Sequence, residues 1–263
     1  MELERIVSDN GVALHAAGEG RLRIAFTERT GGVSEDPYAS LNLGTHVGDD
    51  PVAVAENRLR ALDALGCAGD IDRLLVPNQV HGDEVVTVSS CEEAALHSAR
   101  AAIAAGADGI VCTAPHVPVM LCYADCVPVV LTLGDRGFAV VHSGWKGTYA
   151  GISGKAARML AEAAGGSTSQ IKAFIGPHIQ GDEYEVSPEL LQMFSLRFDN
   201  IHPYGDRLLD LSCAIRQSLE ESGVPSCEIH DPRLSTMRAN AHFFSYRKEN
   251  GICGRHAAIA LLS

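Results

Sequence analysis

The sequence lacks any apolar run long enough to cross a membrane, any internal repeat, and any serine-, glycine- or proline-rich tract that would separate two domains. Charge, glycine or proline interrupts every apolar run well short of the ~20 residues that a membrane-spanning helix needs. Residues 1–7 also lack the basic and apolar regions of a secretion signal. These features predict a cytoplasmic protein with no membrane partner and a single domain over residues 1–263.

Basic residues are scarce as well. The chain has 21 Lys and Arg residues against 33 Asp and Glu residues, a formal net charge of −12 at pH 7. A surface this acidic repels the phosphate backbones of nucleic acids, so small-molecule partners are favoured and a nucleic-acid partner is not expected. Hydrophobic residues form 46% of the chain and charged residues 21%, which excludes a disordered, collagen-like or coiled-coil protein. The sequence carries no prediction of the oligomeric state.

Cysteine is present but has no framework pattern. The eight cysteines lie at positions 67, 91, 112, 122, 126, 213, 227 and 253. Without a secretion signal, reduced thiols are expected rather than disulfides. No two of them have the Cys-x-x-Cys spacing of a structural zinc site. A chemical role is therefore expected for a few of them at most.

Five segments carry the apolar periodicity and end signals of helices. The clearest helix is expected over residues 51–65, with Asp50 as its N-cap, Pro51 as its first residue and Gly66 after its end. Its expected apolar stripe consists of Val52, Ala55, Leu59, Leu62 and Leu65. The other helices are expected over residues 92–105, 155–164, 188–198 and 211–222.

Short runs rich in β-branched residues lie between these helices. They predict strands over residues 74–76, 84–88, 109–112, 117–122, 127–133, 138–142, 171–175 and 257–262. Strands and helices neither alternate regularly nor form separate blocks, so an α/β barrel or a simple doubly wound sheet fits poorly. The predicted fold class is α+β: a single domain built as a layered sandwich, with mixed β-sheets covered by helices.

Residues 129–142 predict an antiparallel hairpin that is buried on both faces. Two apolar runs flank a four-residue turn, Gly134–Gly137. Pairing about this turn places Val129 opposite His142 and brings Cys126 to the same open end of the hairpin. Three residues of offset span roughly 10 Å along a straight strand, so residues 125–128 have to curl inward for Cys126 to meet His142.

Reactive side chains are concentrated at three predicted strand ends, around His81, Cys126 and His142. Loops held by rigid strands commonly carry function, although a single His or Cys in such a place is more often structural. Together, two His and one Cys suit a zinc site with three protein ligands and one open position, as in catalytic zinc. A rival arrangement uses Cys126 as a nucleophile and His142 as its base.

Two cations, Arg58 and Lys146, are candidate anion contacts. Lys146 lies in the glycine-rich segment Ser143–Gly147, whose backbone amides and positive charge suit a phosphate or carboxylate, although the spacing is not that of a P-loop. A turn around a packed Trp145 explains the same residues equally well. Arg58 has only apolar neighbours on its predicted helix, so its partner has to come from elsewhere; a solvated helix edge is the simpler explanation.

Short motifs occur in a defined order between about residues 40 and 256. They are Asn42-Leu43-Gly44, His46–Asp50, Glu56-Asn57-Arg58, Gln79–Gly82, Ala107-Asp108-Gly109, Asp125-Cys126-x-Pro128, Val141-His142-x-Gly144-Trp145-x-Gly147, Ile175-Gly176-Pro177, Tyr184-Glu185-Val186, Leu209-Asp210-Leu211, Phe243–Arg247 and Gly254-Arg255. Each motif is weak alone. The ordered set closely resembles the laccase-domain family, whose members are described as polyphenol oxidases, purine nucleoside phosphorylases or peptidoglycan editing factors.

This resemblance implies a single domain with layered mixed sheets and a metal-binding, catalytic site at His81, Cys126 and His142. It also implies phosphorolysis of adenosine, inosine and 5′-methylthioadenosine, with adenosine deamination as a further activity. Arg58, in the matching Glu-Asn-Arg motif, becomes a better candidate for an anion or substrate contact than its helical position alone suggests.

The chain departs from the family pattern at three positions. Lys146 stands where Arg is usual, which keeps the positive charge but loses the bidentate fork. Gln180 replaces a common Gly. Ser235 precedes Thr236 where the family often has Cys, so no role is carried over for that Cys.

The leading hypothesis is a zinc-dependent purine nucleoside phosphorylase with adenosine deaminase activity, with a nucleoside and phosphate as its partners. Asp125 is the predicted proton carrier beside the three metal ligands, and Arg58 and Lys146 are the predicted phosphate contacts. His46, His116 and His178 are expected to be structural.

Three alternatives come from other classes of protein. The first is a Cys-dependent amide hydrolase that uses Cys126 and His142 on a peptidoglycan precursor. The second is a copper-dependent phenol oxidase; copper is less expected than zinc because the chain lacks the further clustered His ligands of a multicopper centre. The third is a non-catalytic binding module.

Overall fold

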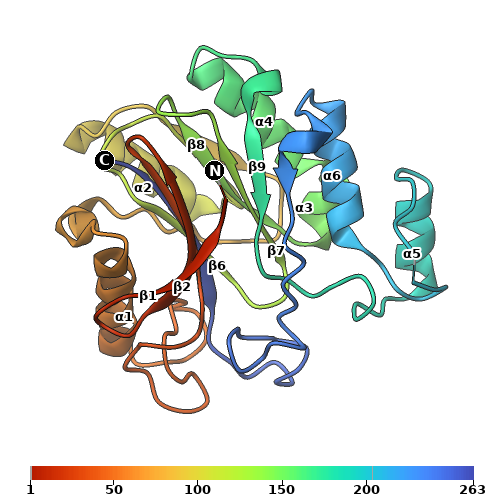
Figure 1. The fold of residues 1–263 in the computed structure, drawn as a ribbon, viewed down its shortest axis with the longest axis horizontal. Helices are drawn as coiled ribbons and strands as arrows, with labels where there is room; N and C mark the ends of the chain where they lie inside the picture. Colours follow the sequence, from red (N-terminus) through yellow and green to blue (C-terminus); the bar gives the residue numbers. More distant parts are fainter. Residues whose placement is uncertain (1, 203) are drawn as a thin grey trace.

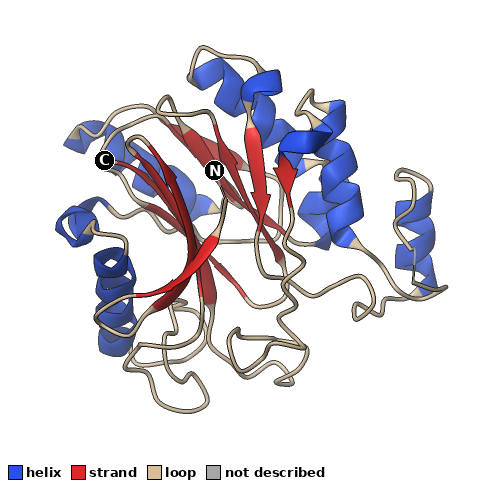
Figure 2. Cartoon of the chain, viewed as in Figure 1, coloured by secondary structure: helices blue, strands red, loops and turns tan. Residues whose placement is uncertain are grey.

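In the computed structural model, which describes residues 2–202 and 204–263, two β-sheets face each other and helices cover their outer sides (Figure 1, Figure 2). The helices are α1 (Pro51–Ala64), α2 (Glu93–Ala105), α3 (Trp145–Ala150), α4 (Ile152–Ala163), α5 (Pro188–Ser195) and α6 (Leu211–Glu221), with 3₁₀ turns at Ala68–Arg73, Thr168–Gln170 and Ser226–Glu228. This arrangement confirms the predicted α+β layered sandwich.

The first sheet is antiparallel and the second is mixed. The first has the order β1 (Glu4–Val7), β2 (Ala13–Glu19), β3 (Leu22–Thr27), β11 (His256–Leu262), β6 (Val119–Tyr123). The second has the order β10 (Ile229–His230), β9 (Lys172–Ile175), β7 (Val127–Thr132), β8 (Phe138–Ser143), β5 (Gly109–Cys112), β4 (Val85–Val88). Only the β10–β9 and β4–β5 pairs of the second sheet are parallel. The prediction of mixed sheets therefore holds for one sheet of the two.

Apolar side chains form three layers of core. Those between the sheets include Phe26 of β3, Tyr123 of β6 and Phe138 of β8, all nearly inaccessible to solvent. A second layer lies between the outer face of the mixed sheet and helices α4–α6, and a third between the antiparallel sheet and α1. Because the strands next to the site are covered on both sides, they position it rigidly.

Helix α1 begins where its N-terminal signals predict, because the carboxylate of Asp50 accepts a hydrogen bond from the Val52 amide at 2.9 Å. Its predicted apolar stripe is wrong in part: Leu62 is buried, but Val52 is 75% exposed and Leu59 is 39% exposed. The buried face instead contains Asn57, whose amide binds the Asn42 carbonyl and the Val33 amide. These polar contacts set the rotation of the helix about its axis.

The β7–β8 hairpin is buried on both faces, as predicted. Its predicted register is one residue off, because His142 pairs with Pro128 and Val129 pairs with Val141. The amide of Leu133 donates to the Gly137 carbonyl, so Leu133 belongs to the turn rather than to the strand. A one-residue change of register reverses the face on which a side chain lies, which is why this pairing matters for His142.

Other boundaries differ from prediction at the ends of elements. Residues 74–76 form an isolated bridge at Leu75 rather than a strand, and the helix predicted over 188–198 ends at Ser195. Strands β1–β3 are absent from the prediction. For β2, ALHAAGE, the reason is its content of alanine and glycine, which have low strand propensity. These residues become strands by pairing with their neighbours. Among the described residues, no helix is both long and apolar enough to cross a lipid bilayer.

Candidate functional site

The three predicted ligands meet at one end of the mixed sheet. His81 lies in the loop before β4, Cys126 directly precedes β7, and His142 is part of β8. One potential ligand atom from each lies within 4.8 Å of the other two. The imidazole rings of His81 and His142 are 4.7 Å apart, edge to face. Residues 45 and 16 positions apart in the sequence therefore form one cluster, as predicted.

Asp108 holds the loop that carries His81. Its carboxylate accepts hydrogen bonds from three successive backbone amides, those of Val80 (3.2 Å), His81 (3.0 Å) and Gly82 (2.7 Å). His81 has a φ of +58°, a left-handed conformation that a non-glycine residue needs local support to keep. The bent loop and the direction of the His81 side chain both depend on this buried carboxylate.

Asp108 also orients His142. Its Oδ1 atom lies 2.8 Å from Nδ1 of His142, and both side chains are buried. Burial acts to raise the pKa of Asp108, but hydrogen bonds from His142 and Gly82 outweigh it and lower that pKa. With Nδ1 held by the carboxylate, Nε2 is the His142 atom left to bind a metal, an arrangement typical of metal-ligating histidines.

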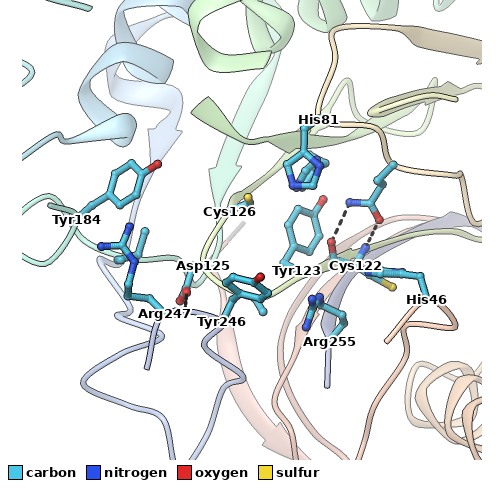
Figure 3. A pocket seen from close by; sticks show the side chains of 14 residues that line it. His46, His81, Cys122, Tyr123, Asp125, Cys126, Tyr184, Tyr246, Arg247 and Arg255 are labelled. Carbon is cyan, nitrogen blue, oxygen red and sulfur yellow. Dashed lines mark hydrogen bonds between the residues drawn. The ribbon is translucent and has the colours of Figure 1, made fainter. Parts of the chain in front are cut away.

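A second clamp sets the loop against the antiparallel sheet. The side-chain amide of Gln79 donates to the Cys122 carbonyl and accepts from the Cys122 amide, both at 2.8 Å (Figure 3). Cys122 belongs to β6, which ends at Tyr123, three residues before Cys126. Gln79 thus ties the His81 loop to the segment that carries the cysteine.

The chain turns inward at Asp125, which brings Cys126 to His142 as the distance argument required. Asp125 has a φ of +89°, and its side chain is buried. Its Oδ1 accepts from the Thr236 hydroxyl and its Oδ2 from the Arg247 amide, both at 2.6 Å. Asp125 therefore joins the turn at Cys126 to the segment between β10 and β11.

The electrostatics of the cluster favour a thiolate. Burial alone would raise the pKa of Cys126, but the charge of His142 and hydrogen bonds from both histidines lower it to about 6. Burial acts to lower the pKa of His142, yet Cys126 and Asp108 raise it to about 9. Burial instead raises the pKa of Cys112 to about 12. Cys126 is thus set apart from a merely buried cysteine by its partners.

Gly144 leaves room beside the cluster. A Cβ atom there would lie 3.2 Å from Cδ2 of His81 and 3.5 Å from Sγ of Cys126. The following residues form helix α3 rather than the predicted turn, so Lys146 is exposed on a helix. A side chain at Gly144 would therefore pack against His81, Cys126 and His142.

The cluster opens into a cavity of about 490 Å³. Its wall contains three tyrosines and two arginines in addition to the three ligands (Figure 3). The lining residues are His46, Gln79, His81, Cys122, Tyr123, Ala124, Asp125, Cys126, His142, Ile179, Tyr184, Tyr246, Arg247 and Arg255. A cavity of this size and mixed polarity is typical of small-molecule sites.

The two predicted phosphate contacts do not line this cavity. Nε and Nη2 of Arg58 both donate to the Leu43 carbonyl, and the residue borders a different, more open cleft beside α1 and α2. Nζ of Lys146 lies 5.5 Å from the centre of the Trp145 ring. The structure therefore gives Arg58 a partner from outside its helix but brings neither cation into the cavity.

Of the three histidines expected to be structural, His46 does line the cavity. Burial, followed by the charge of Arg255, lowers the pKa of His46. His178 is buried and its Nδ1 lies 2.8 Å from the Gly176 carbonyl oxygen, while His116 faces Asp70 at 3.5 Å. Neither His116 nor His178 is among the lining residues.

The donor set fits a metal ion. Two imidazole nitrogens and one thiolate match the ligands of a zinc site with one open position, and copper accepts the same donors. The lowered Cys126 pKa supplies the deprotonated sulfur that a metal needs. Within residues 2–202 and 204–263, this is the one group of three such side chains close enough to share an ion.

Asp108, Arg247 and Arg255 are site residues to which the sequence analysis assigned no role. Asp108 stood in the motif Ala107-Asp108-Gly109, directly before a predicted buried strand. An acidic residue at the start of a buried strand is a sequence signal that could have marked it as a site residue. The arginines stood in the motifs Phe243–Arg247 and Gly254-Arg255, where nothing in the spacing indicates that they approach His81.

Comparison with known proteins agrees with the ordered motifs. A family model described as multi-copper polyphenol oxidoreductase laccase matches residues 23–263. A Deinococcus radiodurans protein named purine nucleoside phosphorylase is 37% identical over 239 residues, which cover 89% of this chain and 87% of that protein. A Mycobacterium tuberculosis protein of the same name is 34% identical over 243 residues, 91% of each chain.

Two solved structures share the fold over nearly their whole length. The hypothetical protein YfiH of Bacillus licheniformis superposes with a TM-score of 0.86 at 28% identity, covering 98% of this chain and 99% of the other. YlmD of Geobacillus stearothermophilus gives a TM-score of 0.85 at 28% identity, with 99% of both chains covered. The layered arrangement of sheets and helices is thus shared with these relatives.

Proposed function

The chain belongs to the multi-copper polyphenol oxidoreductase laccase family, and we propose that it is a purine nucleoside phosphorylase that acts on adenosine, inosine and 5′-methylthioadenosine. Relatives that match most of the chain carry the name purine nucleoside phosphorylase. The observation that carries the proposal is the cavity itself, in which a three-ligand cluster faces aromatic and cationic side chains. Adenosine deamination is proposed as a second activity.

His81, Cys126 and His142 would hold the metal, which we propose to be zinc. When bound there, the ion supplies Lewis acidity that stabilises negative charge developing on a substrate atom. The protein's own contribution is to fix the ligands in advance. Asp108 holds His142 by Nδ1 and the His81 loop by three amides, so little reorganisation is needed when the ligands engage.

Aromatic side chains in the cavity suit a purine ring. Tyr184 and Tyr246 both line it, and Tyr246 is 54% exposed, which leaves ring surface open to a ligand. Flat, polarisable faces bind a flat heterocycle by stacking, while tyrosine hydroxyls bind its polar edge. We propose that these two residues bind the base of the nucleoside.

Phosphorolysis exchanges one bond at the sugar for another. A phosphate oxygen bonds to C1′ of the ribose while the bond from C1′ to the purine nitrogen breaks, and the electron pair leaves with the base. The base takes up a proton, and the products are free purine and ribose 1-phosphate. The site therefore has to place phosphate against C1′ and stabilise the leaving purine, tasks that need a cation and a polar wall.

We propose a positioning role for Asp125 in place of the proton carrier predicted from the sequence. Both of its carboxylate oxygens accept hydrogen bonds from the protein, and its side chain is buried. These contacts hold Cys126 beside the segment that carries Arg247. A carboxylate occupied in this way supports the geometry of the site.

Product analysis after incubation with adenosine, with and without phosphate, tests the proposal. Adenine and ribose 1-phosphate are expected only when phosphate is present, and inosine reports deamination. Cys126→Ala is expected to abolish turnover, whereas Cys227→Ala, at an exposed cysteine outside the cavity, is the matched control. Absence of turnover of all three nucleosides by the metal-loaded protein would contradict the proposal.

A second candidate, amide hydrolysis of a peptidoglycan precursor, is favoured by one observation. The lowered pKa of Cys126 and the raised pKa of His142 describe a thiolate and an imidazolium side by side, the pair that nucleophilic cysteine enzymes use. Hydrolysis that survives chelation of metal but is lost on thiol alkylation would support this candidate over the phosphorylase. Loss of hydrolysis on chelation would argue against it.

The phenol oxidase alternative has less support. A multicopper oxidase needs several groups of clustered ligands, and the described part of the chain offers the single group at His81, Cys126 and His142.

A further inference from the structure

Two cations line the cavity without an acidic partner. Arg247 and Arg255 both come from the segment between β10 and β11, and Figure 3 shows their guanidinium groups on either side of the Tyr246 ring. Arg233 and Arg238, in the same part of the chain, each form ion pairs with carboxylates. Within the described ranges, no carboxylate oxygen lies within 4.0 Å of either cavity guanidinium. The charge of both cavity arginines is therefore available to a ligand.

The protein uses one end of each guanidinium group. Nη1 of Arg247 donates to the Glu185 carbonyl at 3.3 Å, and Nη1 of Arg255 donates to the carbonyls of Cys253 and Gly254 at 2.9 Å. Nε and Nη2 of both residues donate to no atom of residues 2–202 or 204–263. Those two nitrogens share one edge of the group and form the fork that grips two oxygens of an anion.

Packing holds both side chains in place. The guanidinium of Arg247 lies 5.4 Å from the centre of the Tyr184 ring, and that of Arg255 lies 5.6 Å from the Tyr246 ring. A Cβ atom at Gly44 would lie 2.8 Å from Cγ of Arg255, so the absence of a side chain there makes room for the arginine. Each cation–π contact uses a flat face of the guanidinium group and leaves the edge with Nε and Nη2 free.

The acidic lining residue does not cancel this charge. Asp125 directs its two oxygens to the Thr236 hydroxyl and the Arg247 backbone amide, so both oxygens accept hydrogen bonds from groups other than the two guanidiniums. In a chain with a net charge of −12, a cavity with two unpaired arginines is a local site for an anion.

We propose that the free edges of Arg247 and Arg255 make this cavity an oxyanion subsite and that its ligand is inorganic phosphate, the second substrate of phosphorolysis. The phosphate identity rests on the proposed function, whereas the anion subsite rests on the geometry alone. The subsite takes the role that the sequence analysis expected of Arg58 and Lys146. It places phosphate in the same cavity as the three ligands, where the ribose of a bound nucleoside also has to lie.

Steady-state phosphorolysis with varied phosphate tests the subsite. Arg255→Gln and Arg247→Gln are each expected to raise the KM for phosphate about tenfold or more, with a smaller change in the KM for inosine. Arg255→Lys, which keeps the charge but loses the fork, should fall between wild type and Arg255→Gln. Arg136→Gln, in the turn at the opposite end of the β7–β8 hairpin, is the control and should match wild type.

Calorimetric titration of the metal-loaded protein with phosphate gives a readout independent of turnover. Phosphate binding that weakens about tenfold in Arg255→Gln supports the subsite even when no nucleoside is cleaved, in which case only the proposed function fails. Phosphorolysis with an unchanged phosphate KM in both glutamine variants overturns the subsite and leaves the function standing. Adenosine 5′-monophosphate cleaved better than adenosine, with loss of that preference in Arg255→Gln, overturns the assignment to inorganic phosphate.

Discussion

The two walls of the cavity are built in different ways. The wall with Cys126 and His142 belongs to the β7–β8 hairpin, which is buried on both faces and anchored by Asp108. The wall with Tyr246 and Arg247 is an exposed segment without regular strands, tied to the first wall by Asp125. A rigid wall suits metal-ligating side chains, which need a fixed geometry, and a more exposed wall suits recognition of an incoming molecule.

The largest effect is expected at the anchor of the rigid wall. Asp108→Asn keeps the shape but removes the charge that holds Nδ1 of His142 and three backbone amides. Zinc affinity should fall by about 10–100-fold, because ligands lose their orientation. Competition with a chromophoric chelator measures it. Asp83→Asn, on the same loop but exposed, is the control, and equal affinities for both variants would show that Asp108 does not orient the ligands.

A second effect concerns the charge state of Cys126 in the metal-free protein. Since its pKa is lowered to about 6, the thiolate fraction grows as pH rises through 6 and reaches about nine-tenths at neutral pH. Alkylation by iodoacetamide should therefore reach half its maximal rate near pH 6. Cys213, whose pKa burial raises to about 11, should stay slow over this range. Mass-spectrometric mapping separates the two sites, and a Cys126 rate that still climbs above pH 8 would contradict the ion-pair assignment.

The connection between the walls is the third test. Asp125→Asn replaces a charge that accepts hydrogen bonds from Thr236 and Arg247. Loss of a charged hydrogen bond costs about 1.5–3 kcal/mol. The exposed wall should loosen, so the KM for nucleoside should rise more than kcat falls. Thr236→Val removes one of the same two bonds and should act in the same direction. A fall in kcat alone, with a changed pH profile, would instead restore Asp125 as a proton carrier.

The smallest effects are expected for the two cations outside the cavity. Arg58→Ala removes two hydrogen bonds to the Leu43 carbonyl and should lower the free energy of unfolding by about 1–2 kcal/mol. Lys146→Ala, at an exposed helical position, should change it by less than about 0.5 kcal/mol. Neither should alter the KM for phosphate. Urea denaturation and phosphate titration check both, and a tenfold rise in phosphate KM for Arg58→Ala would support the expectation from the sequence.

Most helix starts and five of the six strands of the second sheet followed from local signals; β10 was not predicted. Asp50 caps α1 as predicted, and Ser187 and Asp210 cap the helices that were predicted to begin at residues 188 and 211. Capping is a short-range interaction between a side chain and amides two or three residues ahead. The rotation of α1 did not follow, because the contacts of Asn57 with Val33 and Asn42 are long-range. The hairpin register failed by one residue for a different reason: the Leu133 amide bonds to the Gly137 carbonyl, a local backbone contact that the residue types of the turn do not specify.

The site divides in the same way. His81, Cys126 and His142 were identified from residue type, placement at strand ends and ordered motifs, all of which are written in the sequence. The role of Asp108 was not identified from the sequence, because its carboxylate forms hydrogen bonds with residues 26 to 34 positions away.

By itself the sequence determined the local elements, the three ligand types and the family to which the ordered motifs belong, because these depend on neighbouring residues and their order. Only the tertiary structure decided which cations reach the cavity. Arg58 turns to a backbone carbonyl, whereas Arg247 and Arg255 keep a free edge on the cavity wall. The physical reason is that the direction and partners of a long side chain are set by groups that folding brings next to it, wherever they stand in the chain.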